Sequence, residues 1–414
     1  MNAAQREGQN MRFGLLGEHL GYSYSPQIQL ELHGEEYKCY EVTPEKVGEF
    51  LTQTDLDGMN VTIPYKQTVI PFCVSLSDTA RRIGAVNTLM RKPDGWHGCN
   101  TDYDGFCYML SSAGIDPAGK KALVLGSGGA SRTARTALTD LGAKEVVIIS
   151  RSGSDNYDNL ERHRDAGLIV NTTPVGTYPG NGERLLDLTA FPECEGVADV
   201  VYNPSRTALV LQAEELGIRY TCGLDMLVAQ AARSAGLWLD RKFPDDEVQR
   251  VRRLLESSMQ NIVLIGMPGS GKTSIGKALQ EKTGRRLIDT DQEIVRRTGR
   301  KIPDIIENDG EAAFRQLETD VIGEAGKESG CIIATGGGCV TRKQNYPLLH
   351  QNGRIVWIRR ALDQLPTKGR PLSRAGGMEK MYEQRKELYA AFADITVSND
   401  KTISEAADRI LKRI

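Results

Sequence analysis

Residues 262–273 read Ile-Val-Leu-Ile-Gly-Met-Pro-Gly-Ser-Gly-Lys-Thr. The four apolar residues predict a strand, and the residues after the glycine-rich turn predict a helix. A strand, a turn of this composition and a helix together form the phosphate loop of nucleotide-binding proteins. Backbone N–H groups at the helix start would face the phosphates, Lys272 would reach the terminal phosphates, and the Thr273 hydroxyl would bind Mg²⁺.

A strand-to-helix turn that binds nothing would need neither this lysine nor this threonine. The sequence therefore predicts a site for a nucleoside triphosphate, ATP, with Mg²⁺. The residues expected to contact the nucleotide are Gly269, Ser270, Gly271, Lys272, Thr273 and Ser274.

Length and composition indicate a globular protein with more than one domain. The chain has 414 residues, of which 26% are charged and 40% hydrophobic, and this length allows two or three domains. It has no uninterrupted apolar run of about 18 residues, so we expect no membrane span. Residues 1–10 are polar, unlike a secretory signal, and predict a flexible tail on a cytoplasmic protein.

The charge balance points to small-molecule partners. The formal net charge is -2 and the chain has no dense block of Lys and Arg, so we expect no nucleic-acid binding. The sequence carries no signal for the oligomeric state.

A second glycine cluster lies upstream. A predicted strand, Lys121 to Leu125, leads into Gly-Ser-Gly-Gly-Ala-Ser at 126–131, followed by a helix through Leu141 and a strand from Glu145 to Ser150. This succession predicts a Rossmann-type unit that binds a dinucleotide. The expected cofactor residues are Gly126, Ser127, Gly128, Gly129, Ala130, Ser150, Arg151, Val200 and Gly223.

Arg151 decides between the two nicotinamide dinucleotides. In an NAD site the second strand usually ends in Asp or Glu, which accepts hydrogen bonds from the ribose hydroxyls. Here the strand ends in Ser150-Arg151-Ser152. A guanidinium attracts a 2'-phosphate that a carboxylate would repel, so the sequence favours NADP(H). The alternative is an exposed arginine without this role.

The alternation of strands and helices predicts an α/β fold in three parts. A charged helix from Pro244 to Ser258 precedes a new alternation, which places the main boundary near Met259. We expect residues 11–105 and 225–258 to form a substrate-binding domain and 106–224 a Rossmann domain. We expect 259–414 to form a kinase domain with a parallel sheet flanked by helices.

Six short motifs in the first 256 residues resemble shikimate dehydrogenase when they are taken in order. They are Ser23-Tyr-Ser-Pro26, Asn60-Val-Thr-Ile-Pro-Tyr-Lys66, Ala85-Val-Asn-Thr88, Asn100-Thr-Asp102, Val201-Tyr-Asn-Pro204 and Gly223-Leu-Asp-Met-Leu-Val-Ala-Gln230, with the glycine cluster between the fourth and fifth. The resemblance covers roughly residues 11 to 256.

The resemblance implies a role for each polar residue in these motifs. Ser23 and Ser25 would hold the substrate carboxylate. Lys66 and Asp102 would bracket the carbonyl that becomes a hydroxyl, with Lys66 as proton donor. Taken without the motifs, the same two residues could form a surface salt bridge. The residues implied to surround the substrate ring are Thr62, Asn87, Tyr202 and Gln230.

The Rossmann part departs from the pattern of the family. Only about twenty residues separate Ser150 from the loop Asn171-Thr-Thr-Pro174, where relatives usually have a longer helix and strand. We therefore expect a shortened Rossmann domain with a less complete wall for the adenine.

The C-terminal part resembles shikimate kinase over roughly residues 260 to 414. A predicted strand, Arg286-Leu-Ile-Asp289-Thr-Asp291, follows the phosphate loop and is expected to present both carboxylates on one face. The other motifs that carry the resemblance are Phe314-Arg-Gln-Leu-Glu318, Gly336-Gly-Gly338, Lys368-Gly-Arg-Pro-Leu372 and Gln384-Arg-Lys-Glu-Leu-Tyr389.

This second resemblance implies a phosphoryl-transfer site. Asp291 would take the proton of the substrate hydroxyl, while Thr273 would ligate Mg²⁺ and Asp289 would orient it through water. Arg370 would close over the phosphates and neutralise developing charge. The remaining implied contacts are Arg315 and Arg385, which would clamp the substrate carboxylate, and Gly337, whose missing side chain would leave room for the ring.

The sequence thus predicts a bifunctional enzyme of the shikimate pathway. One part would reduce 3-dehydroshikimate to shikimate with NADPH, and the other would phosphorylate shikimate to shikimate 3-phosphate with ATP. Two alternatives stay open at this point. The N-terminal part could act on quinate as well, or one of the two parts could be a ligand-sensing module without turnover.

Overall fold

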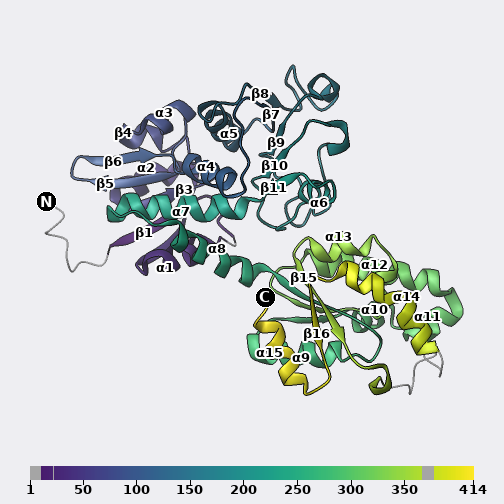
Figure 1. Ribbon diagram of the computed structural model, residues 1–414. Coiled ribbons are helices and arrows are strands. Elements are labelled where there is room, and N and C mark those ends of the chain that lie inside the picture. The colour runs from purple at the N-terminus through teal and green to yellow at the C-terminus, as the bar shows by residue number, and fades with distance from the viewer. Residues whose placement is uncertain (1–10, 22, 366–376) are drawn as a thin grey trace. The chain divides into compact units, whose positions relative to one another are not determined.

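The computed structural model of the chain describes residues 11–21, 23–365 and 377–414. It divides into two compact units, and Figure 1 labels many of their helices and strands. The first unit comprises residues 11–176, Gly182–Tyr202 and Gln212–Leu255. The described residues of the second lie within Thr177–Asn181, Asn203–Leu211 and Glu256–Ile414.

The first of the two sheets in unit 1 is mixed, with the strand order β2-β1-β3-β5-β6-β4. β1 pairs in parallel with β2 and β3, whereas β5 runs antiparallel to β3 and β6. All four residues of β3 are buried, so this strand lies at the centre of the core. The strands are β1 (Arg12–Gly17), β2 (Glu36–Glu41), β3 (Gly58–Val61), β4 (Cys73–Leu76), β5 (Thr88–Lys92) and β6 (Gly95–Cys99).

Helices α4 and α7 pack closely against each other in this unit. Gly105 of α4 makes the approach possible, because a β-carbon there would lie 2.6 Å from the Met226 carbonyl oxygen of α7. The approach brings Asp102, the first residue of α4, towards Gln230 of α7. The helices around this sheet are α1 (Ser25–His33), α2 (Val47–Gln53), α3 (Asp78–Ile83), α4 (Asp102–Ser112), α7 (Gly223–Leu239) and α8 (Asp245–Met259).

The second sheet of unit 1 is parallel, with the order β11-β10-β9-β7-β8. Its strands are β7 (Lys121–Leu125), β8 (Glu145–Ile149), β9 (Leu168–Asn171), β10 (Gly196–Asp199) and β11 (Arg219–Thr221). Helix α5 (Gly129–Asp140) connects β7 to β8, and α6 (Ala208–Glu215) precedes β11.

This order identifies what the Rossmann domain lacks. The usual order of six strands is 3-2-1-4-5-6. Here β7 and β8 correspond to strands 1 and 2, and β9, β10 and β11 to strands 4, 5 and 6. Between β8 and β9 the chain forms only the short 3₁₀ helix η4 (Leu160–His163), so strand 3 has no counterpart and β8 is an edge strand. The predicted shortening of this domain is confirmed.

The second unit contains a parallel sheet with the order β13-β14-β12-β15-β16. Its strands are β12 (Asn261–Ile265), β13 (Leu287–Asp289), β14 (Ile332–Ala334), β15 (Gly353–Arg359) and β16 (Ile395–Ser398). Apolar side chains pack on both faces of the sheet, as is usual for parallel sheets. The flanking helices are α9 (Lys272–Thr283), α10 (Thr290–Thr298), α11 (Ile302–Asp309), α12 (Glu311–Lys327), α13 (Asn345–His350), α14 (Gly377–Phe392) and α15 (Ile403–Leu411).

One local prediction is wrong. Asp289 and Asp291 do not share the face of one strand, because β13 ends at Asp289 and α10 begins at Thr290. Asp289 is the N-cap of α10, and its Oδ1 accepts a hydrogen bond from the Gln292 backbone N–H at 3.1 Å. The cap starts the helix at once and places Asp291 in its first turn.

Across the described stretches of the chain, none of the helices combines the length and the apolar composition needed to cross a lipid bilayer.

Candidate active sites

Four of the side chains predicted for the reductase site meet in one hydrogen-bonded cluster. Lys66 Nζ donates to Asp102 Oδ2 at 2.7 Å. Asn87 Nδ2 lies 2.9 Å from Asp102 Oδ1 and 3.5 Å from Gln230 Oε1. The side chain of Lys66 is 29% exposed and that of Asp102 is 16% exposed. The pair therefore lies in a partly buried site and is not an exposed surface salt bridge.

A buried polar network beneath this cluster fixes the orientation of Asn87. The Asn87 Oδ1 accepts a hydrogen bond from the Thr101 backbone N–H at 2.7 Å, which leaves Nδ2 facing Asp102. The hydroxyls of Thr88 and Thr101 lie 2.8 and 3.0 Å from that of Ser234 on α7. The sequence motifs contain both threonines but gave no hint of Ser234, because these two threonines lie more than a hundred residues upstream of it.

The remaining predicted substrate residues are Ser25, the first residue of α1, and Ser23, Thr62 and Tyr202, which lie outside helices and strands. Ser23 Oγ accepts a hydrogen bond from the Ser25 backbone N–H at 3.2 Å. The ring of Tyr24, between them, meets the Tyr202 ring edge-on with the centroids 6.0 Å apart. Thr62 opens the turn that carries Lys66, and its carbonyl oxygen accepts from the Tyr65 N–H at 2.9 Å. Among the hydrogen bonds of the described residues, none joins the side chains of these four predicted residues to Lys66.

The glycines of the upstream turn, 126–131, are required for different reasons. Gly126 has φ +106°, and a β-carbon there would lie 2.9 Å from Thr173 Cγ2. A β-carbon at Gly128 or Gly129, by contrast, would meet no atom within 4 Å. The packing of the protein therefore explains Gly126 but not the other two. Open space at the N-terminus of α5 is what a phosphate needs for close approach to the backbone.

Arg151 follows the carboxyl end of β8, next to this turn. The Gly126 N–H donates to the Ile149 carbonyl oxygen at 2.8 Å and ties the turn to the end of β8. Arg151 is exposed. Val200 and Gly223, also predicted to contact the cofactor, are in mutual contact, because a β-carbon on Gly223 would collide with the Val200 carbonyl oxygen.

A cavity of about 710 Å³ in the second unit gathers most of the predicted kinase residues. Ser270 is not part of the lining, since its side chain is fully buried behind the loop. Arg370 lies outside the described residues. The predicted residues that line the cavity are Gly269, Gly271, Lys272, Thr273, Ser274, Asp289, Asp291, Arg315, Gly337 and Arg385.

The phosphate loop leads into α9, which begins with Lys272 and Thr273. Gly269 and Gly271 have φ +85° and +99°, values that glycine adopts most readily. Lys272 is 7% exposed, and its Nζ donates to the carbonyl oxygens of Gly266 and Met267 at 2.8 and 3.1 Å. Thr273 Oγ1 donates to Asp289 Oδ2 at 2.7 Å.

Three consecutive glycines let three different neighbours approach the backbone. A β-carbon on Gly336 would collide with Glu318 Oε1 and lie 2.8 Å from Asp291 Oδ1. One on Gly337 would lie 2.6 Å from Pro268 of the phosphate loop, and one on Gly338 would collide with the Arg315 guanidinium. Contact with Pro268 is one reason for glycine at 337, and Gly337 also lines the cavity, so its predicted role of leaving room for the substrate ring stays a prediction.

Glu318 is a buried residue to which the sequence motif assigned no role. Its side chain is 0% exposed, and its Oε2 lies 2.8 Å from Arg315 Nη1. Burial raises the pKa of the Glu318 carboxyl, and the charge of Arg315 opposes this rise. The spacing of three residues on α12 was the signal that could have identified the pair. Glu318 fixes Arg315 at the wall of the cavity.

Arg385 reaches the cavity from α14. Its Nη1 donates to the Gly337 carbonyl oxygen at 3.1 Å, and Tyr389 Oη donates to the same oxygen at 2.5 Å. Arg315 and Arg385 therefore both line one cavity together with Asp291. Two guanidinium groups are well suited to hold a carboxylate.

Comparison with family models gives two matches on different parts of the chain. The substrate-binding domain of shikimate dehydrogenase matches residues 15–89, and shikimate kinase matches residues 268–414. Both resemblances predicted from the motifs are thereby confirmed.

Full-length relatives match the N-terminal part. The shikimate dehydrogenase (NADP(+)) of Clostridium beijerinckii is 31% identical over 269 residues, which are 60% of this chain and 99% of that protein. The protein of the same name from Oleidesulfovibrio alaskensis is 38% identical over 256 residues, which are 56% of this chain and 91% of that protein.

Solved structures match the same part. A chorismate mutase/shikimate 5-dehydrogenase fusion protein from Clostridium acetobutylicum has a TM-score of 0.57 and 35% identity, covering 60% of this chain and 98% of that chain. Shikimate 5-dehydrogenase from Thermus thermophilus, solved with NADP(H) and shikimate, has a TM-score of 0.53 and 32% identity, covering 59% and 99%. The chain therefore belongs to the shikimate dehydrogenase family and carries, in its C-terminal part, a shikimate kinase domain.

Proposed function

We propose that this chain is a bifunctional enzyme that reduces 3-dehydroshikimate to shikimate with NADPH and phosphorylates shikimate at its 3-hydroxyl with ATP and Mg²⁺. The observation that carries the proposal is the presence of two separate polar sites in one chain. One is the Lys66–Asp102 cluster, and the other is the cavity around the phosphate loop. The alternative of a non-catalytic sensing module is not favoured, because both parts match enzyme families.

The reduction needs a proton at the oxygen of the substrate carbonyl. NADPH, when bound, supplies the hydride. Lys66 donates the proton, and Asp102 holds the Lys66 ammonium in place through the 2.7 Å ion pair. Asn87 keeps Asp102 in position because its Nδ2 donates a hydrogen bond to Asp102 Oδ1, the carboxylate oxygen that does not accept from Lys66. We assign the proton transfer to Lys66 because it is the one member of the cluster with a positively charged N–H group.

The phosphorylation needs a base at the substrate hydroxyl and a clamp on the substrate carboxylate. Mg-ATP, when bound, supplies the phosphoryl group. Asp291 accepts the hydroxyl proton, and Arg315 and Arg385 hold the carboxylate. Thr273 would hold Mg²⁺ and Asp289, which pairs with Thr273, would orient it through water, while the phosphates supply further oxygen atoms, the ligand type that suits this ion. No group of three or more His, Cys, Asp or Glu side chains within the described ranges is placed to bind a metal alone.

A second cavity of about 570 Å³ gives room for the nucleoside part of ATP. It is lined by Met267 and Arg360 among others, and Arg360 also lines the phosphate-loop cavity. Arg360 Nη1 donates to the Gly269 carbonyl oxygen at 3.5 Å. The residue shared by both cavities is thus attached to the phosphate loop, and we add Arg360 to the expected nucleotide contacts.

The function is tested with a coupled assay on the full chain. The mixture contains 3-dehydroshikimate, NADPH, ATP and Mg²⁺, and both shikimate and shikimate 3-phosphate are quantified. We expect shikimate without ATP and shikimate 3-phosphate when ATP is added. Absence of either product would remove the corresponding half of the proposal. Replacing 3-dehydroshikimate by 3-dehydroquinate measures whether quinate is also formed.

Cofactor choice gives a prediction for Arg151. We expect Arg151→Ala to lower kcat/KM for NADPH about tenfold or more and to leave kcat/KM for NADH nearly unchanged, because only NADPH carries the 2'-phosphate. Steady-state rates with each cofactor decide it. Arg162→Ala, at another exposed arginine of the same unit, is the control. Equal losses with both cofactors would place Arg151 outside the 2'-phosphate site.

The contact between Gly338 and Arg315 gives a second prediction. A methyl group at 338 would collide with the guanidinium, so Gly338→Ala should displace one half of the carboxylate clamp. We expect the KM for shikimate to rise about tenfold or more, while the KM for ATP changes little. The control is Gly323→Ala on α12, where the nearest atom to the new methyl is Leu348 Cδ1 at 3.8 Å. An unchanged KM for shikimate would show that Arg315 does not bind its carboxylate.

A further inference from the structure

A cavity of about 600 Å³ lies in unit 1 at the end of the parallel sheet that is opposite to the cofactor turn. Its walls include Leu168, Gly196 and Arg219, the first residues of β9, β10 and β11. The cofactor turn follows the other end of the sheet, after Leu125. Ligands of such folds bind at the carboxyl ends of the strands. This cavity is therefore a different place, and none of the predicted site residues lines it.

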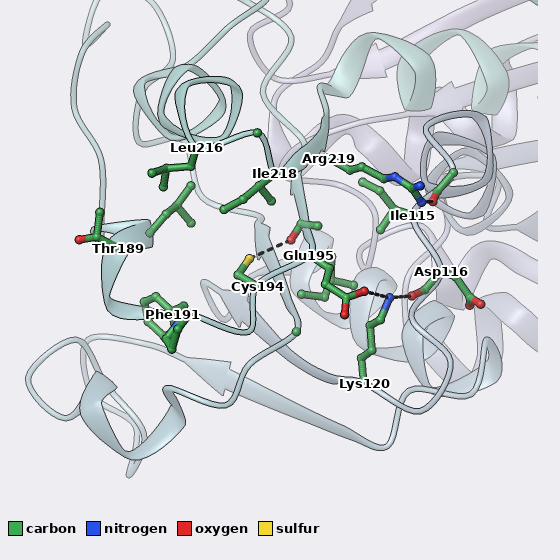
Figure 2. Close-up of a pocket in the computed structure, with 17 residues that line it drawn as sticks. Ile115, Asp116, Lys120, Thr189, Phe191, Cys194, Glu195, Leu216, Ile218 and Arg219 are labelled. Carbon is green, nitrogen blue, oxygen red and sulfur yellow. Dashed lines mark hydrogen bonds and ion pairs between the residues drawn. The ribbon is translucent and has the colours of Figure 1, made fainter.

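One side of the cavity carries charges of both signs. Lys120 Nζ lies 2.8 Å from Glu195 Oε2 and donates to the Asp116 carbonyl oxygen at 3.0 Å. Figure 2 shows Lys120, Glu195 and Asp116 gathered on this side. Arg219 Nη1 donates to the Gly114 carbonyl oxygen at 2.9 Å. The Lys120 ammonium, and to a lesser degree the Arg219 guanidinium, lower the pKa of the Glu195 carboxyl, whose side chain is 70% exposed.

The opposite side is mainly apolar, with Thr189 as a polar neighbour, and is partly exposed. Leu216 and Phe191 lie there in Figure 2, with Ile218 between them and the charged side. Phe191 is 2% exposed and forms the floor of the cavity on this side, whereas Leu216 is 44% exposed. Ile218 is half-buried. A ligand in the cavity would therefore remove apolar surface of Leu216 and Ile218 from water, which favours binding.

The one cysteine in the lining of this cavity is not suited to covalent chemistry. Cys194 lies in its wall, and its thiol donates to the Gly196 carbonyl oxygen at 3.3 Å. Burial raises the pKa of the Cys194 thiol to about 11, so the thiol stays protonated at neutral pH and is a poor nucleophile.

We propose that this cavity binds a small zwitterion with an apolar side chain, the chemical class of the aliphatic and aromatic amino acids. Its carboxylate pairs with Arg219 and Lys120, its ammonium group pairs with Glu195, and its side chain covers Leu216 and Ile218. A ligand with a single charge fits less well. An anion would face Glu195, and a cation would face Lys120 and Arg219, so only a molecule with both charges matches both signs.

The proposal is tested by isothermal titration calorimetry on the full chain with L-phenylalanine as the probe. Three analogues each remove one feature: 3-phenylpropionate lacks the ammonium group, phenethylamine lacks the carboxylate, and glycine lacks the apolar side chain. We expect L-phenylalanine to bind, and each analogue to bind about tenfold more weakly or worse.

Variants locate the binding on the protein. We expect Glu195→Gln and Leu216→Asp each to weaken the binding of L-phenylalanine about tenfold or more. Glu193→Gln, at an exposed glutamate two positions away that does not line the cavity, should leave it unchanged. Reductase activity close to that of the unaltered chain shows that the variants are folded.

Three results would overturn the proposal. The first is no binding of L-phenylalanine up to about 10 mM, a concentration at which even weak sites fill. The second is equal affinity for L-phenylalanine and 3-phenylpropionate. The third is binding of L-phenylalanine that both cavity variants leave intact. The last would place the amino acid elsewhere on the chain. Because the cavity contains no residue of either proposed active site, failure here leaves the proposed reductase and kinase activities untouched.

Discussion

An Asp291→Asn variant is expected to bind Mg-ATP like the unaltered enzyme and to phosphorylate shikimate at least about 10²-fold more slowly. Asparagine keeps the size of the side chain and can still form a hydrogen bond with the substrate hydroxyl, but it cannot accept the proton. The nucleotide side of the cavity is unaffected, because Thr273 and Lys272 keep their partners Asp289 and the Gly266 carbonyl oxygen. Calorimetry with a non-hydrolysable ATP analogue and shikimate-dependent ADP release measure the two effects on one protein.

Asp289→Asn is the matched comparison, since it lies two residues away and lines the same cavity. Asparagine is a good N-cap, so α10 should still begin at Thr290. Because Asp289 pairs with Thr273, we expect Asp289→Asn to weaken Mg-ATP binding. Asp291→Asn, by contrast, should leave Mg-ATP binding unchanged. ADP release from Asp291→Asn at the unaltered rate would remove Asp291 as the base. A loss of nucleotide affinity in the Asp291→Asn variant would assign Asp291 to the metal site.

Lys66→Ala should lower the reduction of 3-dehydroshikimate about 10²- to 10⁴-fold, the usual contribution of a general acid. Shikimate kinase activity should stay near that of the unaltered enzyme, because the phosphate-loop cavity belongs to the other unit. NADPH oxidation and ADP release, measured on the same preparation, provide the comparison.

Lys38→Ala serves as the control for this variant. Lys38 also forms an ion pair, with Glu36, but its side chain is 60% exposed on β2. Its loss should change neither activity. If Lys66→Ala reduced the substrate at a rate within a few fold of Lys38→Ala, the proton would have to come from another group.

The sequence predicted best those features that short stretches of chain determine. The phosphate loop is an example, because the strand before it, its glycines and the helix from Lys272 are all neighbours in sequence. The shortened Rossmann domain also followed from a simple count of residues between Ser150 and Asn171, and the strand order confirms it.

Contacts between distant residues could not be predicted in the same way. The close contact of Gly337 is with Pro268, about seventy residues earlier, and the orientation of Asn87 depends on a network that reaches Ser234. The error at Asp289 and Asp291 has a local cause. Side chains alternate between two faces only while a strand continues, and here the N-cap Asp289 ends the strand. The pattern Asp289-x-x-Gln292, similar to a capping box, was the available warning.

The edge position of β8 affects how a dinucleotide would be held. With no third strand beyond β8, less protein surface can cover the adenine, so a larger share of the attraction has to come from charged contacts to the phosphates. Such contacts at exposed side chains, which would include the one proposed for Arg151, weaken as the ionic strength rises, whereas burial of an adenine does not. A dehydrogenase shortened in this way thus exchanges a salt-independent hold on its cofactor for one that depends on the ionic strength of its surroundings.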